Sequence, residues 1–60
     1  MKVYVNDQEV DLAPGMNVRH ALTAAGLINE IDKGKKVYDE MGNEIGLGGA
    51  LTDGLRINVR

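Results

Sequence analysis

The segment from Asn17 to Leu27 constrains the fold most, because it carries signals for both ends of a short helix and for one apolar face. Asn17 is a residue type that accepts hydrogen bonds from first-turn amides, and Gly26 can take the left-handed conformation that ends a helix, with Leu27 turned back toward Leu22. The apolar residues recur at the spacing of one helical face, namely Val18, Ala21, Leu22 and Ala25. A helix of about two and a half turns is not stable alone in water, so this face must pack on other elements.

Alternating apolar and polar residues predict the strands on which that helix packs. Residues 2–6 and 9–12 form a predicted hairpin, and residues 55–60 form the last strand. Residues 35–38 predict a third strand, and residues 44–47 a brief additional one. The side chains expected to face the core are Met1, Val3, Val5, Val10, Leu12, Val37, Leu55, Ile57 and Val59.

The turns between these elements have recognisable chemistry. Residues 6–8 form a polar turn, and Pro14 and Gly15 suit the middle of a type II turn before the helix. Residues 39–43 and 52–54 predict further turns, whereas residues 27–34 have no clean period and predict a tethered connection without a helix.

The order of elements is therefore strand, strand, helix, strand, possible brief strand, strand. The compact arrangement places the first and last strands side by side in parallel at the sheet centre, with one helix crossing over the inward face. Residues 1–60 are expected to form a single α+β domain with a mixed sheet and one helix on one face, which is the β-grasp arrangement.

Composition excludes several classes of protein. The chain has 60 residues and no cysteine, so disulfides, thiolate metal sites and iron–sulfur clusters are excluded. The net charge of −2 argues against a general nucleic-acid binder. No apolar run approaches the roughly 20 residues that span a bilayer, and no signal-peptide core is present, so a cytoplasmic protein without membrane contact is expected.

Three segments carry a resemblance to the ubiquitin-like β-grasp superfamily. Val3 to Val10 resembles the opening hairpin of the small sulfur carriers of thiamin and molybdopterin biosynthesis, Pro14 to Val18 resembles their entry into the helix, and Leu51 to Val59 is similar to their closing turn and strand. TGS domains share this pattern. The first half is also similar to plant-type ferredoxin domains, but the absence of cysteine rules out their cluster.

The resemblance to sulfur carriers fails at their functional signature, a carboxy-terminal Gly-Gly tail. The chain ends at Arg60 within its last strand, and Gly48-Gly49 lies 11 residues earlier, where a tight buried turn is the expected role. Two alternatives stay open: a sulfur carrier whose tail is missing from these 60 residues, and a TGS-like regulatory or RNA-contacting module.

No group of residues predicts catalysis, a cofactor or a metal site. His20, the only histidine, is expected to be a solvated helix residue, because no spacing supplies further ligands or a nucleophile. Asp39, Glu40 and Glu44 surround a turn and are expected to solubilise it. Gly46 to Gly49 lacks the following Lys-Ser/Thr and the helix of a phosphate-binding loop. The chain is therefore not expected to be an enzyme.

The outward face of the sheet is the predicted partner-binding surface. It is expected to run from an acidic edge, with Glu9 and Asp11, to a basic centre that carries both tyrosines. Tyrosine and arginine are enriched at interface hot spots, so we expect an unidentified protein partner. The edge strands of the sheet are open to pairing with another copy, so we expect a monomer or a weak homo-oligomer. The predicted partner-binding residues are Lys2, Tyr4, Lys36, Tyr38, Arg56 and Arg60.

Overall fold

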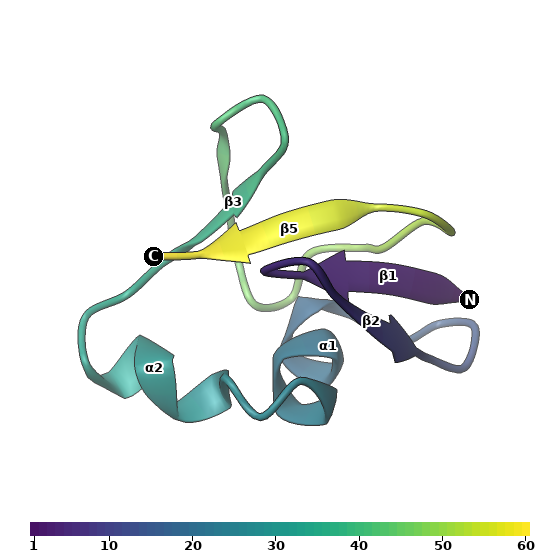
Figure 1. Ribbon diagram of the computed structural model, residues 1–60, viewed down its shortest axis with the longest axis horizontal. Helices are drawn as coiled ribbons and strands as arrows, with labels where there is room; N and C mark the ends of the chain where they lie inside the picture. The colour runs from purple at the N-terminus through teal and green to yellow at the C-terminus, as the bar shows by residue number, and fades with distance from the viewer.

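The computed structural model describes residues 1–60 as a small α+β domain with a five-stranded mixed sheet and two helices (Figure 1). The sheet has the order β2-β1-β5-β3-β4, in which β1 and β5 are parallel and the other neighbours are antiparallel. The elements are β1 (Lys2–Val5), β2 (Gln8–Asp11), α1 (Val18–Ala24), α2 (Ile28–Asp32), β3 (Val37–Asp39), β4 (Glu44–Ile45) and β5 (Arg56–Val59). The five predicted strands are present in the predicted order along the chain, with ends that differ from the predicted ones by at most two residues.

Backbone hydrogen bonds join the first and last strands at the centre of the sheet. The Tyr4 N–H donates to the Leu55 carbonyl at 2.9 Å, and the Asn6 N–H donates to the Ile57 carbonyl at 3.0 Å. Asn6 continues the pairing with its side chain, because its Oδ1 accepts from the Val59 N–H at 2.8 Å. The parallel contact between the two ends of the chain is thus fixed over the length of both strands.

The turn before β5 holds the start of β1. Asp53 Oδ1 accepts from the Lys2 N–H at 2.7 Å, and the Gly54 N–H donates to the Lys2 carbonyl at 2.6 Å. Gly54 has a φ of 84°, a conformation that glycine adopts without a steric penalty. The predicted turn therefore both reverses the chain and sets the register of the central pair.

The β1–β2 hairpin closes through a two-residue turn. Asn6 and Asp7 have φ values of 49° and 68°, and Val5 lies opposite Gln8. Positive φ at both central residues is the signature of a type I′ turn, whose twist matches that of the strands it joins, and Asn and Asp tolerate it. The predicted polar turn at residues 6–8 is confirmed in this tighter form.

The core lies between the sheet and α1. Burying a Val, Leu or Ile side chain contributes about 1.5–3 kcal/mol, so a cluster of this size supplies most of the folding drive in a chain this short. Of the side chains predicted to face inward, Met1 and Leu55 are half-buried and the others are buried. The buried residues are Val3, Val5, Val10, Leu12, Val18, Ala21, Leu22, Val37, Ile57 and Val59.

Both ends of α1 are formed as the sequence predicts. Asn17 Oδ1 accepts from the His20 N–H at 3.3 Å, while His20 Nδ1 accepts from the Asn17 N–H at 3.1 Å, so histidine completes a capping box. At the other end the Leu27 N–H donates to the Leu22 carbonyl at 2.8 Å, and Gly26 has a φ of 75°. This is the Schellman closure.

The prediction of a single helix is wrong, because residues predicted as a tethered connection include a second helix, α2. It ends in its own Schellman closure: Gly34 has a φ of 93°, and the Lys35 N–H donates to the Glu30 carbonyl at 3.2 Å. The Glu30 carboxylate also contacts Lys33 at 3.0 Å and Lys35 at 3.3 Å, and hydrogen bonds from these two lysines lower the pKa of Glu30. The Glu30 ion pairs and the closure at Gly34 thus stabilise α2. Its five residues are too few to show the apolar period of a helix.

The glycine-rich loop after β4 caps the amino end of α1. The Val18 N–H donates to the Gly49 carbonyl at 3.1 Å, and the Arg19 N–H donates to the Leu47 carbonyl at 2.9 Å. The loop therefore presents carbonyl groups to these two amides, and they are not free to bind phosphate. The expected turn at Gly48-Gly49 is present, but it is not buried: Gly48 is exposed and Gly49 is half-buried. The close approach is at Gly49 alone, where a Cβ would lie 3.1 Å from the Gly46 carbonyl oxygen and 3.4 Å from Val18 Cγ2.

Gly49→Ala should therefore destabilise the protein by about 1–2 kcal/mol, because the added methyl group crowds the loop against α1. Gly48→Ala is the matched control: no atom lies within 4 Å of its added Cβ, and neither glycine has a positive φ. Its effect should stay within about 0.5 kcal/mol. Urea denaturation of both variants measures the difference, and equal stabilities would contradict a close approach at Gly49.

Candidate functional site

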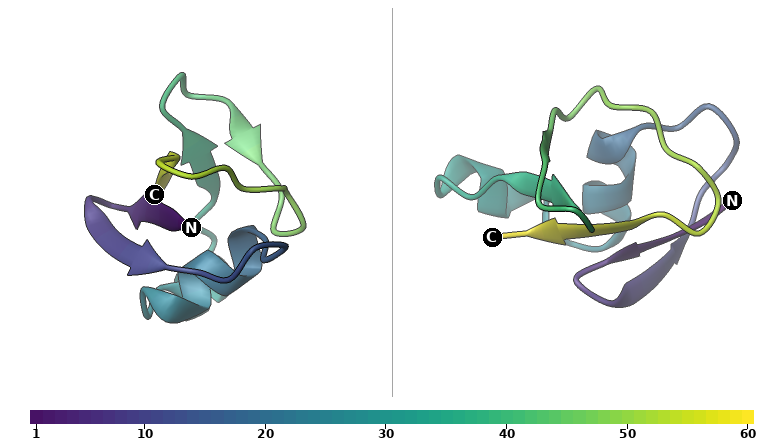
Figure 2. Two further views of the ribbon diagram at one scale, coloured as in Figure 1. Left: turned by 90° about the vertical axis from the view of Figure 1, so that its right-hand side faces the viewer. Right: turned by 90° about the horizontal axis from the view of Figure 1, so that it is seen from above.

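The surface of the sheet opposite the helices is the candidate site. On β1 and β5 the buried residues alternate with exposed or half-buried ones. The buried set faces α1, and both helices lie on this same side of the central strands (Figures 1 and 2). The alternate side chains therefore form an open face, defined here as Lys2, Tyr4, Glu9, Asp11, Lys36, Tyr38, Glu44, Arg56, Asn58 and Arg60.

Two arginine–tyrosine pairs lie on the open face. The Arg56 guanidinium carbon lies 4.3 Å from the centroid of the Tyr4 ring, and these residues are direct partners between β1 and β5. The Arg60 guanidinium carbon lies 4.8 Å from the centroid of the Tyr38 ring. Each contact is a cation–π interaction of about 0.5–1 kcal/mol at exposed sites. Parallel pairing of β5 with β1 and antiparallel pairing with β3 thus bring four of the six predicted partner-binding residues into two stacked pairs.

Lys36 and Arg60 lie next to the strands rather than inside them. Lys36 precedes β3 and Arg60 follows β5, and their backbones exchange two hydrogen bonds of 3.0 Å. Lys36 is therefore beside the Arg60–Tyr38 pair. Lys2, the sixth predicted residue, lies on the other side of the face and pairs with Glu9 across the hairpin at 3.9 Å.

The electrostatic pattern is more balanced than the predicted gradient from an acidic edge to a basic centre. Glu44 adds a carboxylate at the opposite edge, 3.7 Å from Lys36 Nζ. Asp7, in the hairpin turn, lies 3.6 Å from Arg56. Three of the four predicted cations thus have a carboxylate neighbour, whereas Arg60 has none. Sequence reasoning missed the contacts of Asp7 and Glu44 with the predicted cations, because they depend on the turn geometry and on the β3–β4 register.

The carboxylates around the turn between β3 and β4 are not arranged for acid–base catalysis. Asp39 Oδ1 accepts from the Met41 and Asn43 backbone amides, each at 2.9 Å. The hydrogen bond from the Asn43 backbone is the main reason that the pKa of Asp39 lies below its usual value. The Asp39 carboxylate therefore holds the turn together, a structural role beyond the solubilising one that the sequence predicts for this segment.

No group of three or more His, Cys, Asp or Glu side chains is placed to hold a metal ion. Neither helix has the length and apolar composition needed to cross a membrane. His20 is exposed, and its Nδ1 is engaged by the cap of α1.

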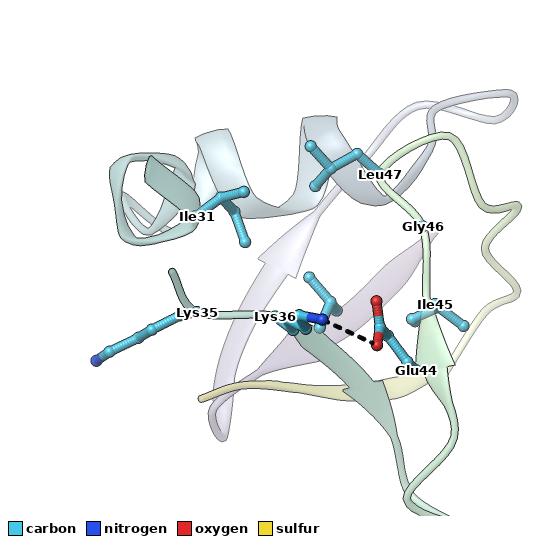
Figure 3. Close-up of a pocket in the computed structure, with 8 residues that line it drawn as sticks. Ile31, Lys35, Lys36, Glu44, Ile45, Gly46 and Leu47 are labelled. Atoms are coloured by element: carbon cyan, nitrogen blue, oxygen red, sulfur yellow. Dashed lines mark ion pairs between the residues drawn. The ribbon is translucent and has the colours of Figure 1, made fainter. Parts of the chain in front are cut away.

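Two surface hollows flank α1 and α2. A small one of about 130 Å³ lies between α2 and the β3–β4 hairpin, where Ile31 and Leu47 approach from opposite sides and the Lys36–Glu44 ion pair lies at its margin (Figure 3). A larger groove of about 380 Å³ lies between the end of β2 and α1. Both are separate from the two arginine–tyrosine pairs of the open face.

Comparison with known proteins assigns no family to this site. No protein-family model matches the chain, and neither the curated proteins nor the solved structures include a match. Its function must therefore be inferred from the geometry above.

The lowered pKa of Asp39 predicts a specific loss of stability in acid. Since the pKa is lower in the folded than in the unfolded state, the contribution of Asp39 is present above the unfolded value of about 4 and is lost as the pH falls through the folded value. Asp39→Asn should remove this part of the acid dependence, which thermal unfolding at pH 2 to 7 measures.

Glu40→Gln is the matched control, because Glu40 lies in the same turn and makes no ion pair or side-chain hydrogen bond there. It should leave the acid dependence nearly unchanged. If Asp39→Asn and wild type lose stability in parallel below pH 4, the role assigned to the Asp39 carboxylate is wrong.

Proposed function

We propose that this chain is a non-catalytic domain of the ubiquitin-like β-grasp superfamily that binds a protein partner through the open face. The single observation that carries the proposal is the presence of two arginine–tyrosine pairs on the surface that no helix covers. The proposed contact residues are Lys2, Tyr4, Lys36, Tyr38, Arg56 and Arg60.

The strand order supports the superfamily assignment. A hairpin whose first strand pairs in parallel with the last strand, with a helix packed over the pair, is the arrangement expected from the resemblance to the sulfur carriers and TGS domains. The sulfur carriers act through a terminal glycine carboxylate. Gly49 instead caps α1 through its carbonyl, so the internal glycine pair does not supply that chemistry.

The stacked pairs support binding because they are partly ordered before a partner arrives. Ordering a long side chain at an interface costs about 0.5–1.5 kcal/mol, and a guanidinium already resting on a tyrosine ring has lost part of that freedom. Tyr4 and Tyr38 are half-buried, so each presents a ring edge and a hydroxyl group from a fixed position. Tyrosine and arginine together are the residues that dominate binding energy at protein interfaces.

The distribution of charge favours a protein over a nucleic acid as the partner. Lys2, Lys36 and Arg56 each lie within 4 Å of a carboxylate, which competes with phosphate for the same donors. A protein surface with separate acidic and polar groups can match such an alternating pattern, whereas a phosphate backbone is uniformly negative. A TGS-like contact with nucleic acid is therefore the second candidate function.

Partner capture followed by mapping tests the proposal. Immobilised wild type and the double variant Arg56→Gln/Arg60→Gln are exposed to extract of the source cells, and retained proteins are quantified by mass spectrometry. Because hot-spot residues each contribute more than about 1 kcal/mol, the open-face variant should retain the partner about tenfold less or worse.

The matched control is Arg19→Gln/Lys33→Gln, which removes the same charge from α1 and from the residue that follows α2, and should retain the partner like wild type. NMR titration with the purified partner should then shift Tyr4, Tyr38 and Arg56 signals. Equal loss of capture in both double variants, or shifts confined to α1 and α2, would contradict binding through the open face.

A further inference from the structure

The larger groove, between the end of β2 and α1, is a second surface with a definite chemistry. Its volume of about 380 Å³ lies in the range of small-molecule sites, which span about 300–1,000 Å³. It is separate from the two arginine–tyrosine pairs, because α1 forms one of its walls, and Asp11 is the one residue that it shares with the open face. The α1 groove is lined by Asp11, Leu12, Ala13, Met16, Arg19, His20, Thr23 and Ala24.

The apolar part of the α1 groove is contributed by both of its walls. Leu12 is buried and Met16 is half-buried, whereas Ala13 and Ala24 are exposed and too small to fill the space between them. Such a hollow gains free energy when an apolar group displaces its water, at about 25 cal/mol for each Å² of apolar surface removed from water. The groove therefore suits an apolar ligand body of modest size.

The polar side of the groove favours a negative group. Arg19 is the one cationic side chain of the domain that has neither a carboxylate partner within 4 Å nor a tyrosine ring beneath it. His20 accepts at Nδ1 from the Asn17 N–H, so its neutral form carries the proton on Nε2 and offers a further donor. A carboxylate matches a guanidinium beside an imidazole N–H.

The other charges near the α1 groove leave this preference in place. Asp11 also lines it, at the end of β2, but 77% of its side chain is exposed to solvent, which screens its charge. In the smaller hollow of Figure 3, by contrast, Lys35 pairs with Glu30 and Lys36 pairs with Glu44. Only the α1 groove combines open apolar space with an uncommitted cation.

We propose that the α1 groove binds a small amphipathic carboxylate, an organic acid whose apolar body rests on Leu12, Met16 and Ala24 while its carboxylate contacts Arg19. The ligand class follows from the shape, the apolar lining and the single free guanidinium. This site is independent of the proposed docking function of the open face.

NMR titration of methyl-labelled protein with octanoate tests the site, with octanol and octylamine as ligands of equal chain length. Octanoate should shift the methyl signals of Leu12, Ala13, Met16 and Ala24, and should bind more tightly than octanol, with octylamine weakest. Arg19→Gln should weaken octanoate about two- to fivefold, to the affinity of octanol, because an exposed charge pair contributes about that much.

Two further variants test whether octanoate binds in the α1 groove. Ala24→Leu, at an exposed helical position, should block octanoate and octanol alike by filling the groove. Lys36→Gln, at the margin of the smaller hollow, should leave octanoate affinity unchanged.

Several results would overturn the proposal. These are the absence of shifts at millimolar octanoate, equal binding of octanoate and octanol with no effect of Arg19→Gln, or shifts centred on Ile31 and Leu47. Shifts of the groove methyl groups that depend on protein concentration without ligand would show that a second copy of the chain occupies the groove, and would also overturn it.

Discussion

Parallel pairing of β1 with β5 is the interaction on which the rest of the structure depends. The two strands come from opposite ends of the chain, so their hydrogen bonds close a loop that contains every other element. Asp53 fixes one end of the pair and Asn6 fixes the other through side-chain hydrogen bonds to backbone groups. Once this register is set, Val5 and Ile57 face α1, whereas Tyr4 and Arg56 face away from it.

The same register gives the domain two chemically different surfaces. On one side, apolar residues meet α1 and leave a groove where small alanine side chains do not fill the space. On the other side, antiparallel pairing of β3 with β5 places Tyr38 beside Arg60, and the stacked pairs are surrounded by ion pairs. A buried core and an open polar face coexist in the same strands because successive side chains of a strand point to opposite sides of the sheet.

The sequence predicts the features that depend on local chemistry. The caps of α1, the inward valines of β1 and the turn at Gly54 are each encoded within a few residues, and the structure confirms them. Helix α2 was missed because five residues cannot show a helical period, although Gly34 and the Glu30–Lys33 pair signal its end. The contacts of Asp7 and Glu44 and the lining of the α1 groove follow from tertiary register, which no local pattern contains.

Native-state hydrogen exchange tests the central pairing most directly. The amide hydrogens of Tyr4 and Asn6 donate across the β1–β5 pair, so they should exchange only through global unfolding, with protection equal to that of the most stable amides of the domain. The amide of Glu40, in the exposed turn after β3, provides the unprotected reference. Exchange of Tyr4 and Asn6 at the rate of Glu40 would show that β1 and β5 are not paired, and the open face would not exist as described.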